Sequence, residues 1–365
     1  MLAIEMLPAG HGDALVVEYG TRADPHRILI DGGSFHAWDG VRAELLRRRS
    51  DHYEVFVVTH IDEDHIGGAL ALLDDPDLRH RVDHVWFNGF VHCVSGGNVL
   101  GPINGEQLTQ RIATGGFRWN AGFTPKASAE VGGPVVVPSA GDLPTIDLPG
   151  GARVVLLSPT GAKLKSLAKE WTTVVTAARL VPGAGTSGHT TSPRPHEKVV
   201  AALPDPLDRA AIKLMATKNA SDSSAANGSC IAFVLEHDGR RVLLGADAHS
   251  SVLTAALKRY AQLVGEARPR FDLVKLAHHG SNANISTAML DLIDCRRFLV
   301  STNGDNFAHP DDAALAKIID AYPDGVTFFC NYQTERTIPW AEHGPDVGAT
   351  FTFPRPGKNV LRVTA

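Results

Sequence analysis

The chain has 365 residues, of which 44% are hydrophobic and 21% charged, a composition typical of a globular protein with a substantial core. Its formal net charge of −5 excludes a protein held on nucleic acid by bulk charge alone, because that binding needs clustered Lys and Arg. No segment reaches the roughly 18 consecutive apolar residues that span a bilayer, and the N-terminus lacks the basic start of a secretory signal. We therefore expect a cytoplasmic protein with no membrane contact.

The pattern of cysteines is also consistent with the reducing cytoplasm. They are scattered beside apolar stretches and lack the paired spacing of a zinc site or a disulfide framework. We expect each of them to be a buried free thiol: Cys93, Cys230, Cys295 and Cys330.

The first part of the chain alternates between predicted strands and helices. Apolar and β-branched residues with period two predict strands, and a longer amphipathic period predicts helices. Strands are expected at 2–7, 14–19, 27–31, 54–59 and 82–88, and helices at 40–50 and from Asp64 to residue 75.

The middle of the chain contains two stretches rich in small and polar residues, 182–198 and 219–229, which predict flexible insertions. A helical pattern at 161–182 precedes the first stretch. The second leads into a hairpin whose strands are IAFVLEH and RVLLGAD, with HDGR as the turn. After it we expect a helix beyond Pro310 and strands in FDLVKL, RRFLVST, VTFFCN, ATFTF and NVLRVTA.

The paired opening strands and the later hairpins exclude a purely doubly wound parallel sheet. The rhythm instead indicates an α/β protein of two similar halves. Each half would be a set of strands flanked by helices, packed together as αβ/βα layers.

The densest group of potential metal ligands follows the predicted strand at 54–59. Within THIDEDHIGG (59–68), four such side chains fall inside six residues: His60, Asp62, Asp64 and His65. A strand or a helix cannot bring all four to one side, whereas a tight loop leading into a helix can. They could then divide between two adjacent metal ions. The alternative is an ordinary helix N-terminus capped by one of the aspartates, but a cap needs no histidines.

This segment resembles the HxHxDH motif of the metallo-β-lactamase superfamily, in the HxDxDH variant of ComEC-type competence proteins and their soluble relatives. The resemblance continues in order through five segments: GHGDALVV (10–17), ILIDGG (28–33), VLLGADAH (242–249), KLAHHGS (275–281) and STNGDNFAHP (301–310). It implies a four-layer αβ/βα sandwich of two mixed sheets flanked by helices. Residues 1–365 would form a single metallo-β-lactamase-like domain that carries the two insertions.

The resemblance also implies a centre of two divalent ions, zinc or manganese, with magnesium as a further option. His60 and Asp62 would hold the first ion, and Asp64 and His65 the second. Asp247 would bridge the two ions. We favour His279 over His278 as the last ligand of the second ion.

Many family members carry one further histidine before the bridging aspartate, and this chain does not. The polar residues near that place are Asp222, Asn227 and Ser229. A first metal site with one imidazole and more oxygen ligands offers hard ligands in the hard–soft sense. Such ligands make Mn²⁺ or Mg²⁺ more competitive with Zn²⁺.

Other residues are expected to act on or contact substrate. Asp64 and His278 are predicted catalytic residues, and His309 is a third candidate. His278 would either contact substrate or protonate a leaving group. Asp31 is expected either to stabilise its turn or to act directly, and Asp13 to orient a ligand histidine. The predicted substrate contacts are Asn88, Ser281, Asn282 and Asn303.

Three observations favour phosphoryl chemistry: the resemblance to ComEC-type domains, which are thought to be nucleases, the hard ligand set, and the neutral donors around the site. We therefore interpret the chain as a phosphodiesterase, specifically a nuclease that acts on DNA through a water activated by two metals. A local basic rim could then help to hold the substrate; its candidates are Lys213, Lys218, Arg240, Arg241 and Lys275.

Two alternatives stay open at this point. One is a small-molecule hydrolase of the same fold, such as an ester or phosphocholine-type hydrolase. The other is a partner-binding regulatory module with a degraded metal site, since a histidine is missing and two soft loops could dock a protein. Soluble relatives often occur in bacterial conflict or signalling loci, which would supply such a partner.

Overall fold

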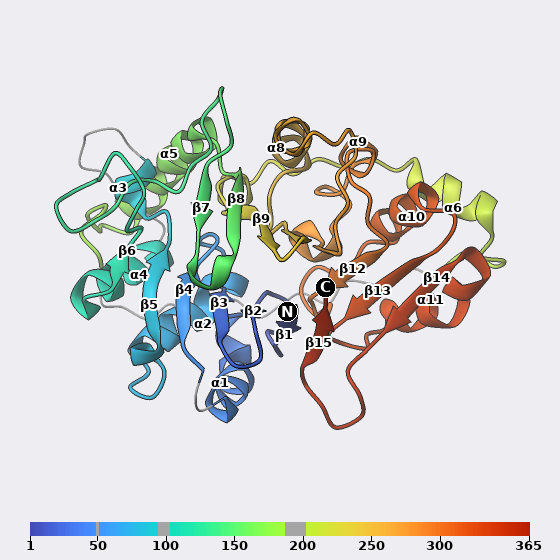
Figure 1. The fold of residues 1–365 in the computed structure, drawn as a ribbon, viewed down its shortest axis with the longest axis horizontal. Helices are drawn as coiled ribbons and strands as arrows, with labels where there is room; N and C mark the ends of the chain where they lie inside the picture. Colours follow the sequence, from blue (N-terminus) through green and yellow to red (C-terminus); the bar gives the residue numbers. More distant parts are fainter. Residues whose placement is uncertain (49–50, 94–102, 187–201) are drawn as a thin grey trace.

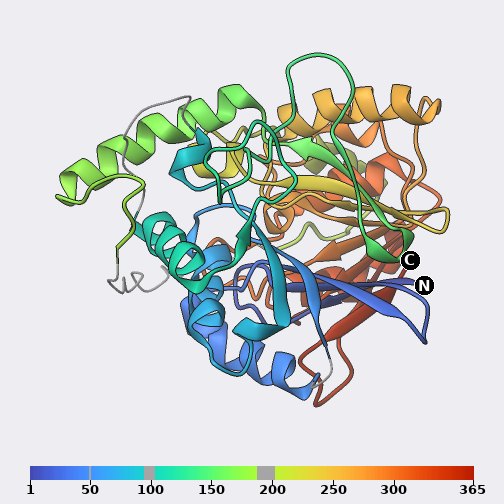
Figure 2. The same cartoon turned by 60° about the vertical axis from the view of Figure 1, so that its left-hand side comes forward.

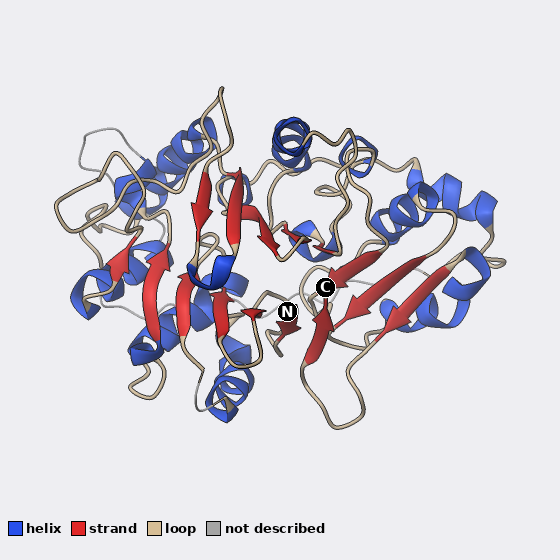
Figure 3. Cartoon of the chain, viewed as in Figure 1, coloured by secondary structure: helices blue, strands red, loops and turns tan. Residues whose placement is uncertain are grey.

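Two mixed β-sheets form the centre of the protein (Figures 1 and 3). The computed structural model describes residues 1–48, 51–93, 103–186 and 202–365. The first sheet has the order β15-β1-β2-β3-β4-β5-β6. Its strands are β1 (Leu2–Met6), β2 (Leu15–Gly20), β3 (Pro25–Ile30), β4 (Tyr53–Val57), β5 (Val82–Trp86), β6 (Arg118–Trp119) and β15 (Leu361–Thr364).

The second sheet has the order β14-β13-β12-β11-β10-β9-β8-β7. Its strands are β7 (Thr145–Asp147), β8 (Arg153–Ser158), β9 (Ala232–His237), β10 (Arg240–Leu244), β11 (Leu273–Lys275), β12 (Arg297–Val300), β13 (Val326–Cys330) and β14 (Ala349–Thr352). The hairpin expected around HDGR is confirmed, because β9 and β10 pair antiparallel from His237 and Arg240 onward.

Helices cover the outer faces of the two sheets, as the two views of the ribbon show (Figures 1 and 2). The first sheet is covered by α1 (Trp38–Arg47), α2 (Glu63–Asp74) and α4 (Ile103–Gly115). The other longer helices are α5 (Gly161–Ala177), α6 (Arg209–Ala216), α8 (Ser250–Val264), α10 (Asp312–Ala321) and α11 (Thr337–His343). The short ones are α3 (Phe90–Cys93), α7 (Ala225–Gly228) and α9 (Thr287–Leu290). The expected four-layer αβ/βα arrangement is thereby confirmed.

Successive side chains along a strand point to opposite faces of its sheet, and they contribute to two separate hydrophobic clusters. On β4, Val55 and Val57 belong to the cluster between the sheets, whereas Phe56 belongs to the cluster under α1 and α2. This is the period-two pattern of a strand buried on both faces. All four cysteines are free and buried, as expected.

The two expected insertions differ in what the structure describes. Most of 182–198 lies outside the described residues. The segment 219–229 includes α7, and its last residues, 226–229, are buried, whereas residues 219–221 are exposed. The end of this stretch therefore packs against the protein. Within the described part of the chain, no helix combines the length and apolar character needed to cross a membrane.

The sheet topology determines where the functional loops meet. Strands β3, β4 and β5 run parallel to one another, and so do β10 to β14. Parallel strands place their carboxyl ends at one edge of a sheet, where α/β proteins usually bind ligands. The loops that follow β3, β4, β10, β11 and β12 carry Asp31, His60, Asp247, His279 and His309.

Candidate metal centre

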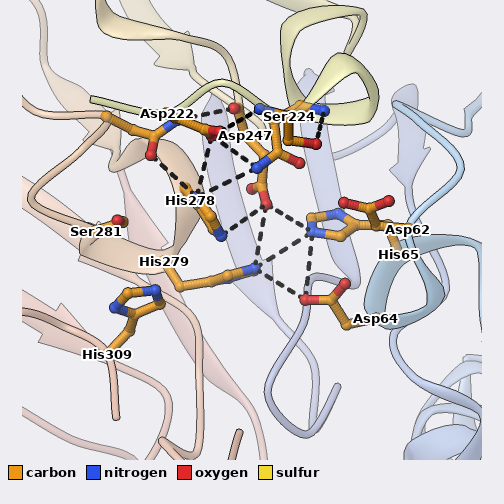
Figure 4. A network of polar contacts seen from close by, with 12 residues as sticks. Asp62, Asp64, His65, Asp222, Ser224, Asp247, His278, His279, Ser281 and His309 are labelled. Carbon is orange, nitrogen blue, oxygen red and sulfur yellow. Dashed lines mark hydrogen bonds and ion pairs between the residues drawn. The ribbon is translucent and has the colours of Figure 1, made fainter. Parts of the chain in front are cut away.

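Four predicted ligands converge on one point (Figure 4). Asp247 Oδ2 lies 3.4 Å from His65 Nε2 and 3.7 Å from His279 Nε2. Asp64 Oδ2 lies 3.3 Å from His279 Nε2 and 3.8 Å from His65 Nε2. The ligand atoms of Asp64, His65 and His279 all fall within 4.8 Å of one another. Asp64 and His65 lie in the first turn of α2, whereas Asp247 and His279 lie in the loops after β10 and β11. The spacing of these side chains suits a shared cation.

The two residues expected at the first ion face the same carboxylate. His60 Nε2 lies 3.9 Å from Asp247 Oδ2 and 3.6 Å from Asp62 Oδ2. Asp62 is the N-terminal cap residue of α2, but its side chain makes no capping hydrogen bond. The capping alternative is therefore wrong for Asp62, and its side chain, 41% exposed, stays available at the mouth of the site.

Hydrogen-bond acceptors behind two histidines determine which ring nitrogen carries the proton. His65 Nδ1 lies 2.8 Å from Asp31 Oδ2, and His279 Nδ1 lies 2.8 Å from the Ser301 carbonyl oxygen. Both partners can only accept a hydrogen bond, so Nδ1 must donate. In each neutral ring this leaves the lone pair on Nε2, which faces the site.

His60 is oriented through a relay that starts from the same aspartate. Thr59 Oγ1 donates to Asp31 Oδ2 over 2.8 Å and lies 2.9 Å from His60 Nδ1. Because the hydroxyl has already given its one proton to Asp31, it accepts from His60 Nδ1. Asp31 is fully buried and sets the tautomer of both His60 and His65, so its role is positioning rather than direct catalysis.

The arrangement leaves lone pairs and carboxylates facing one another. His65 Nε2 and His279 Nε2 are 3.3 Å apart, beside the carboxylates of Asp64 and Asp247. Among the described residues, His60 Nε2 and Asp247 Oδ1 are buried without a hydrogen-bond partner, which is costly unless positive charge lies between them. Nitrogen and oxygen donors of this kind bind zinc or manganese. The residues therefore fit a centre of two divalent ions.

Protonation of the histidines is the other way to neutralise this cluster. Burial lowers the pKa of His279, but Asp247, Asp13 and Asp64 raise it, and the result is a pKa of about 9. Burial also lowers the pKa of His65, yet Asp247, Asp64 and Asp31 raise it well above its usual value. Metal binding must displace these protons, so the affinity for metal should fall as the pH is lowered.

His278 reaches Asp247 from the same loop as His279. Both residues adopt left-handed backbone conformations, with φ of 48° and 54°, which cost on the order of 1 kcal/mol each. His278 Nε2 lies 3.8 Å from Asp247 Oδ2, and its Nδ1 lies 3.0 Å from Asn284 Oδ1. Only His279 of the pair also has an ion-pair contact with Asp64 among the described residues, which favours His279 as the ligand. The His278 side chain is 21% exposed and can face substrate.

Asp222 supports His278 from behind. Its Oδ2 lies 3.5 Å from His278 Nδ1 and accepts hydrogen bonds from Asn227 Nδ2 over 2.7 Å and from Asn284 Nδ2 over 3.0 Å. Asp222 therefore positions His278 instead of replacing the missing histidine ligand. Asn227 Oδ1 is buried and has no hydrogen-bond partner among the described residues.

His309 contacts His278 and Asp311 rather than the metal-ligand cluster itself. Its Nδ1 is 3.3 Å from Asp311 Oδ1, and its ring centroid is 5.2 Å from that of His278. Burial lowers the pKa of His309, although Asp311 opposes this effect. Of the three predicted catalytic residues, Asp64 and His278 thus contact the metal-ligand cluster, whereas His309 packs against His278 (Figure 4).

Two predicted substrate contacts have other roles in the structure. The side-chain amide of Asn88 donates to the Val135 carbonyl over 2.8 Å and accepts from the Val135 amide over 2.9 Å. Asn282 Oδ1 accepts from the buried Lys317 Nζ over 2.7 Å. Both side chains therefore bond to distant segments: both polar atoms of the Asn88 amide are engaged with Val135, and Oδ1 of Asn282 is engaged with Lys317.

The other two predicted contacts are Ser281 and Asn303. Ser281 lies beside His278 and His309 in Figure 4, and its hydroxyl accepts from the Ala283 amide over 3.4 Å. Asn303 Oδ1 accepts from the Asp305 amide over 3.1 Å, which stabilises the loop after β12. A substrate contact by either residue stays a prediction.

The expected basic rim is wrong for three of its five residues. Lys275 is 1% exposed, and its Nζ donates to Asp13 Oδ2 over 2.7 Å. Asp13 Oδ1 in turn lies 3.6 Å from His279 Nδ1, so this pair supports a ligand histidine, as expected of Asp13. Arg240 and Arg241 begin β10, at the end opposite Asp247, and they pair with acidic side chains there.

Thr59 is a further residue of the site that no motif had indicated. Its hydroxyl links Asp31 to His60, and its backbone amide donates to Asp31 Oδ1 over 2.7 Å. The signal was its position, a hydroxyl residue directly before the first histidine of the motif, where a side chain can reach the ring nitrogen of its neighbour.

No family model matches the sequence, and no curated protein matches it either. Among solved structures, CmlA, a diiron β-hydroxylase from Streptomyces venezuelae, is 15% identical with a TM-score of 0.38, covering 100% of this chain and 54% of its own. This chain thus spans about half the length of CmlA.

Two further structures have names that refer to the metallo-β-lactamase fold. YhfI from Bacillus subtilis, a metallo-β-lactamase fold protein, is 8% identical with a TM-score of 0.36 and 100% coverage of both chains. The MIM-2 metallo-β-lactamase is 13% identical with a TM-score of 0.27 and 84% coverage of both chains. At TM-scores below 0.5 these likenesses establish nothing about the chemistry of this chain, which must be argued from its own residues.

Proposed function

We propose that this chain is a metal-dependent hydrolase of phosphodiesters, and that its substrate is a DNA strand or another nucleotide diester. The observation that carries the proposal is the group of imidazole nitrogens and carboxylates around Asp247. Asp31, Thr59 and the Ser301 carbonyl orient three of these imidazoles with Nε2 toward that carboxylate. A chain has little reason to bury such a cluster unless it binds cations.

Two divalent ions bound here would acidify a water molecule and neutralise charge on the phosphate oxygens. The protein supplies orientation and proton transfer. Burial lowers the pKa of His278, but Asp247 and the hydrogen bond to Asp222 raise it, and the net effect is a rise. The raised pKa favours the protonated form of His278. From that form Nε2 would donate a proton to a leaving oxygen, with Asn284 and Asp222 fixing the ring.

A small phosphodiester is the second candidate substrate, and one observation favours it. Three of the five basic residues expected to hold a long polyanion are not available at the site, since Lys275 is buried and Arg240 and Arg241 lie at the opposite end of β10. A long nucleic acid strand normally needs such cations along its path. The metal centre itself would serve either substrate.

The test is metal analysis combined with activity, comparing wild type with Asp64→Ala. Purified protein should bind about two Mn²⁺ or Zn²⁺ per chain and cleave at least one of single-stranded DNA, duplex DNA or bis(p-nitrophenyl) phosphate. We expect Asp64→Ala to lose one ion and roughly 100-fold or more in activity, since loss of a residue that merely supports a ligand already costs 10–100-fold.

The matched control is Asp83→Ala. Asp83 lies near the start of β5, at the opposite edge of the first sheet, and its side chain is 50% exposed. This variant should keep both the metal content and the activity of wild type. Equal activity of Asp64→Ala and wild type, or no bound metal in wild type, would refute the proposal.

A further inference from the structure

An exposed aromatic side chain stands at the mouth of the metal centre. Phe307 is 42% exposed, although phenylalanine is among the residue types most often fully buried. Its ring stacks on the ring of His309, with centroids 5.9 Å apart and an interplanar angle of 25°. The same ring meets His278 edge-on at 6.4 Å. Phe307, His309 and His278 thus form a small aromatic wall.

This wall leads directly to the metal-ligand cluster. His278 contacts both other members of the wall, and its Nε2 lies 3.8 Å from Asp247 Oδ2. A planar group lying against Phe307 would therefore sit beside the reacting phosphate, within the span of one nucleotide.

The loop that carries Phe307 is held at several points. The Asn303 amide donates to the Gly10 carbonyl over 2.9 Å, the Thr302 amide donates to Asn331 Oδ1 over 3.0 Å, and Arg336 Nε donates to the Ala308 carbonyl over 3.2 Å. A surface fixed in this way loses little conformational freedom when a ligand binds.

We propose that Phe307 is a stacking platform for the base or other planar ring next to the scissile phosphate, which makes a nucleoside phosphodiester the substrate class of this site. The inference rests on the proposed phosphodiesterase function. Stacking on an aromatic side chain tolerates any base, because every base has a π-face. It also provides affinity that does not depend on a basic rim, which this site lacks at Lys275, Arg240 and Arg241.

A choline-type cation is the competing occupant, since aromatic faces also bind quaternary ammonium groups. Such sites surround the cation with several electron-rich rings. Among the described residues, the wall contains one phenylalanine, and its other two members are histidines. This composition favours a neutral planar ring.

The experiment measures binding to the Mn²⁺-loaded protein by calorimetry, with thymidine 5′-phosphate, methyl phosphate and phosphocholine as ligands. None of these monophosphates is a diester, so the measurement does not depend on turnover. Wild type should bind thymidine 5′-phosphate roughly tenfold more tightly than methyl phosphate. Phe307→Ala should abolish that preference while changing methyl phosphate binding less than twofold, and Phe307→Tyr should retain the preference.

The matched control is Leu263→Ala. Leu263 is 47% exposed near the C-terminal end of α8, about 20 Å along that helix from the site, and its loss should leave all three affinities unchanged. Equal binding of thymidine 5′-phosphate and methyl phosphate by wild type would overturn the platform, as would an unchanged preference in Phe307→Ala. Tighter, Phe307-dependent binding of phosphocholine would overturn it in favour of a cationic ligand. Absent cleavage of every diester would instead count against the proposed function alone.

Discussion

A single buried carboxylate connects the histidines expected at both metal ions. Asp31 accepts directly from His65 Nδ1 and, through the Thr59 hydroxyl, determines the proton on His60 Nδ1. Oriented histidines bind metal more tightly, because the ring does not have to be held in place at the time of binding. Substitutions can therefore distinguish the direct contact of Asp31 with His65 from its contact with His60 through Thr59.

Asp31→Asn should weaken the binding of both ions, whereas Thr59→Val should weaken the binding of only the ion that His60 would hold. The first change removes the charged acceptor behind His65 and disturbs the relay. The second removes the hydroxyl but keeps the shape and the backbone bond from Thr59 to Asp31. We expect losses of roughly 10–100-fold in metal affinity, measured by calorimetric titration with Mn²⁺. Equal weakening of both ions by Thr59→Val would contradict the relay.

The ligands themselves could be predicted because they are adjacent in the sequence or follow recognisable strands. His60 to His65 form one motif, and Asp247 and His279 each come directly after a strand. The direction of an isolated polar side chain could not be predicted in the same way. Asn282 turns toward Lys317, a residue 35 positions later, and Lys275 turns toward Asp13, 262 positions earlier. Those partners depend on tertiary packing.

At the scale of elements, the position of α2 depends on a close backbone approach. A Cβ added to Gly68 would lie 1.9 Å from the Gly32 carbonyl oxygen, and the Gly68 amide donates to the Gly33 carbonyl over 2.8 Å. The turn that carries Asp31 therefore packs directly on the helix that carries Asp64 and His65. The strand, tight loop and helix predicted around this motif are confirmed by β4, residues 58–62 and α2.

The short helix α3 is held by a buried histidine that titrates far from its usual range. His92 Nε2 lies 3.3 Å from the Gly132 carbonyl and its ring packs edge-on against Trp119, with centroids 4.9 Å apart. Burial lowers the pKa of His92 to about 4, despite backbone hydrogen bonds that oppose the shift. The folded protein therefore keeps this ring neutral where the unfolded chain would protonate it.

We expect this histidine to make the protein less stable in acid. With an unfolded pKa near 6.5 and a folded pKa of about 4, the unfolded state binds more protons between these values. The stability contribution is thus complete above pH 6.5 and is lost as the pH falls toward 4, by on the order of 3 kcal/mol in total. Urea unfolding at pH 7.5, 6, 5 and 4.5 measures it.

The comparison that isolates His92 is the variant His92→Gln, which has no titrating ring. Its free energy of unfolding should fall less than that of wild type between pH 6.5 and 4.5. His80→Gln, a substitution at an exposed histidine, should follow the wild-type profile. Parallel profiles for wild type and His92→Gln would show that His92 is not the titrating group.

At the scale of the whole molecule, the candidate metal centre joins the two sheets. His60, Asp64 and His65 follow a strand of the first sheet, whereas Asp247 and His279 follow strands of the second. The sequence predicted this two-half architecture from its rhythm. It could not predict that the last strand, β15, closes the first sheet by pairing with β1, because no local pattern specifies a partner more than 350 residues away.

Because both sheets supply ligands, metal should stabilise the entire fold and not only the loops. A ligand present at 100 times its dissociation constant adds about 2.7 kcal/mol to the free energy of unfolding for each site, which raises the melting temperature by several degrees. Wild type in EDTA should therefore melt below wild type in excess Mn²⁺.

Asp247→Asn removes the carboxylate that both groups of ligands share, so its melting temperature should be nearly the same in EDTA and in Mn²⁺. Asp83→Asn, at the opposite edge of the first sheet, should respond as wild type does. A full response to Mn²⁺ in Asp247→Asn would mean that the ions bind somewhere other than between the two sheets.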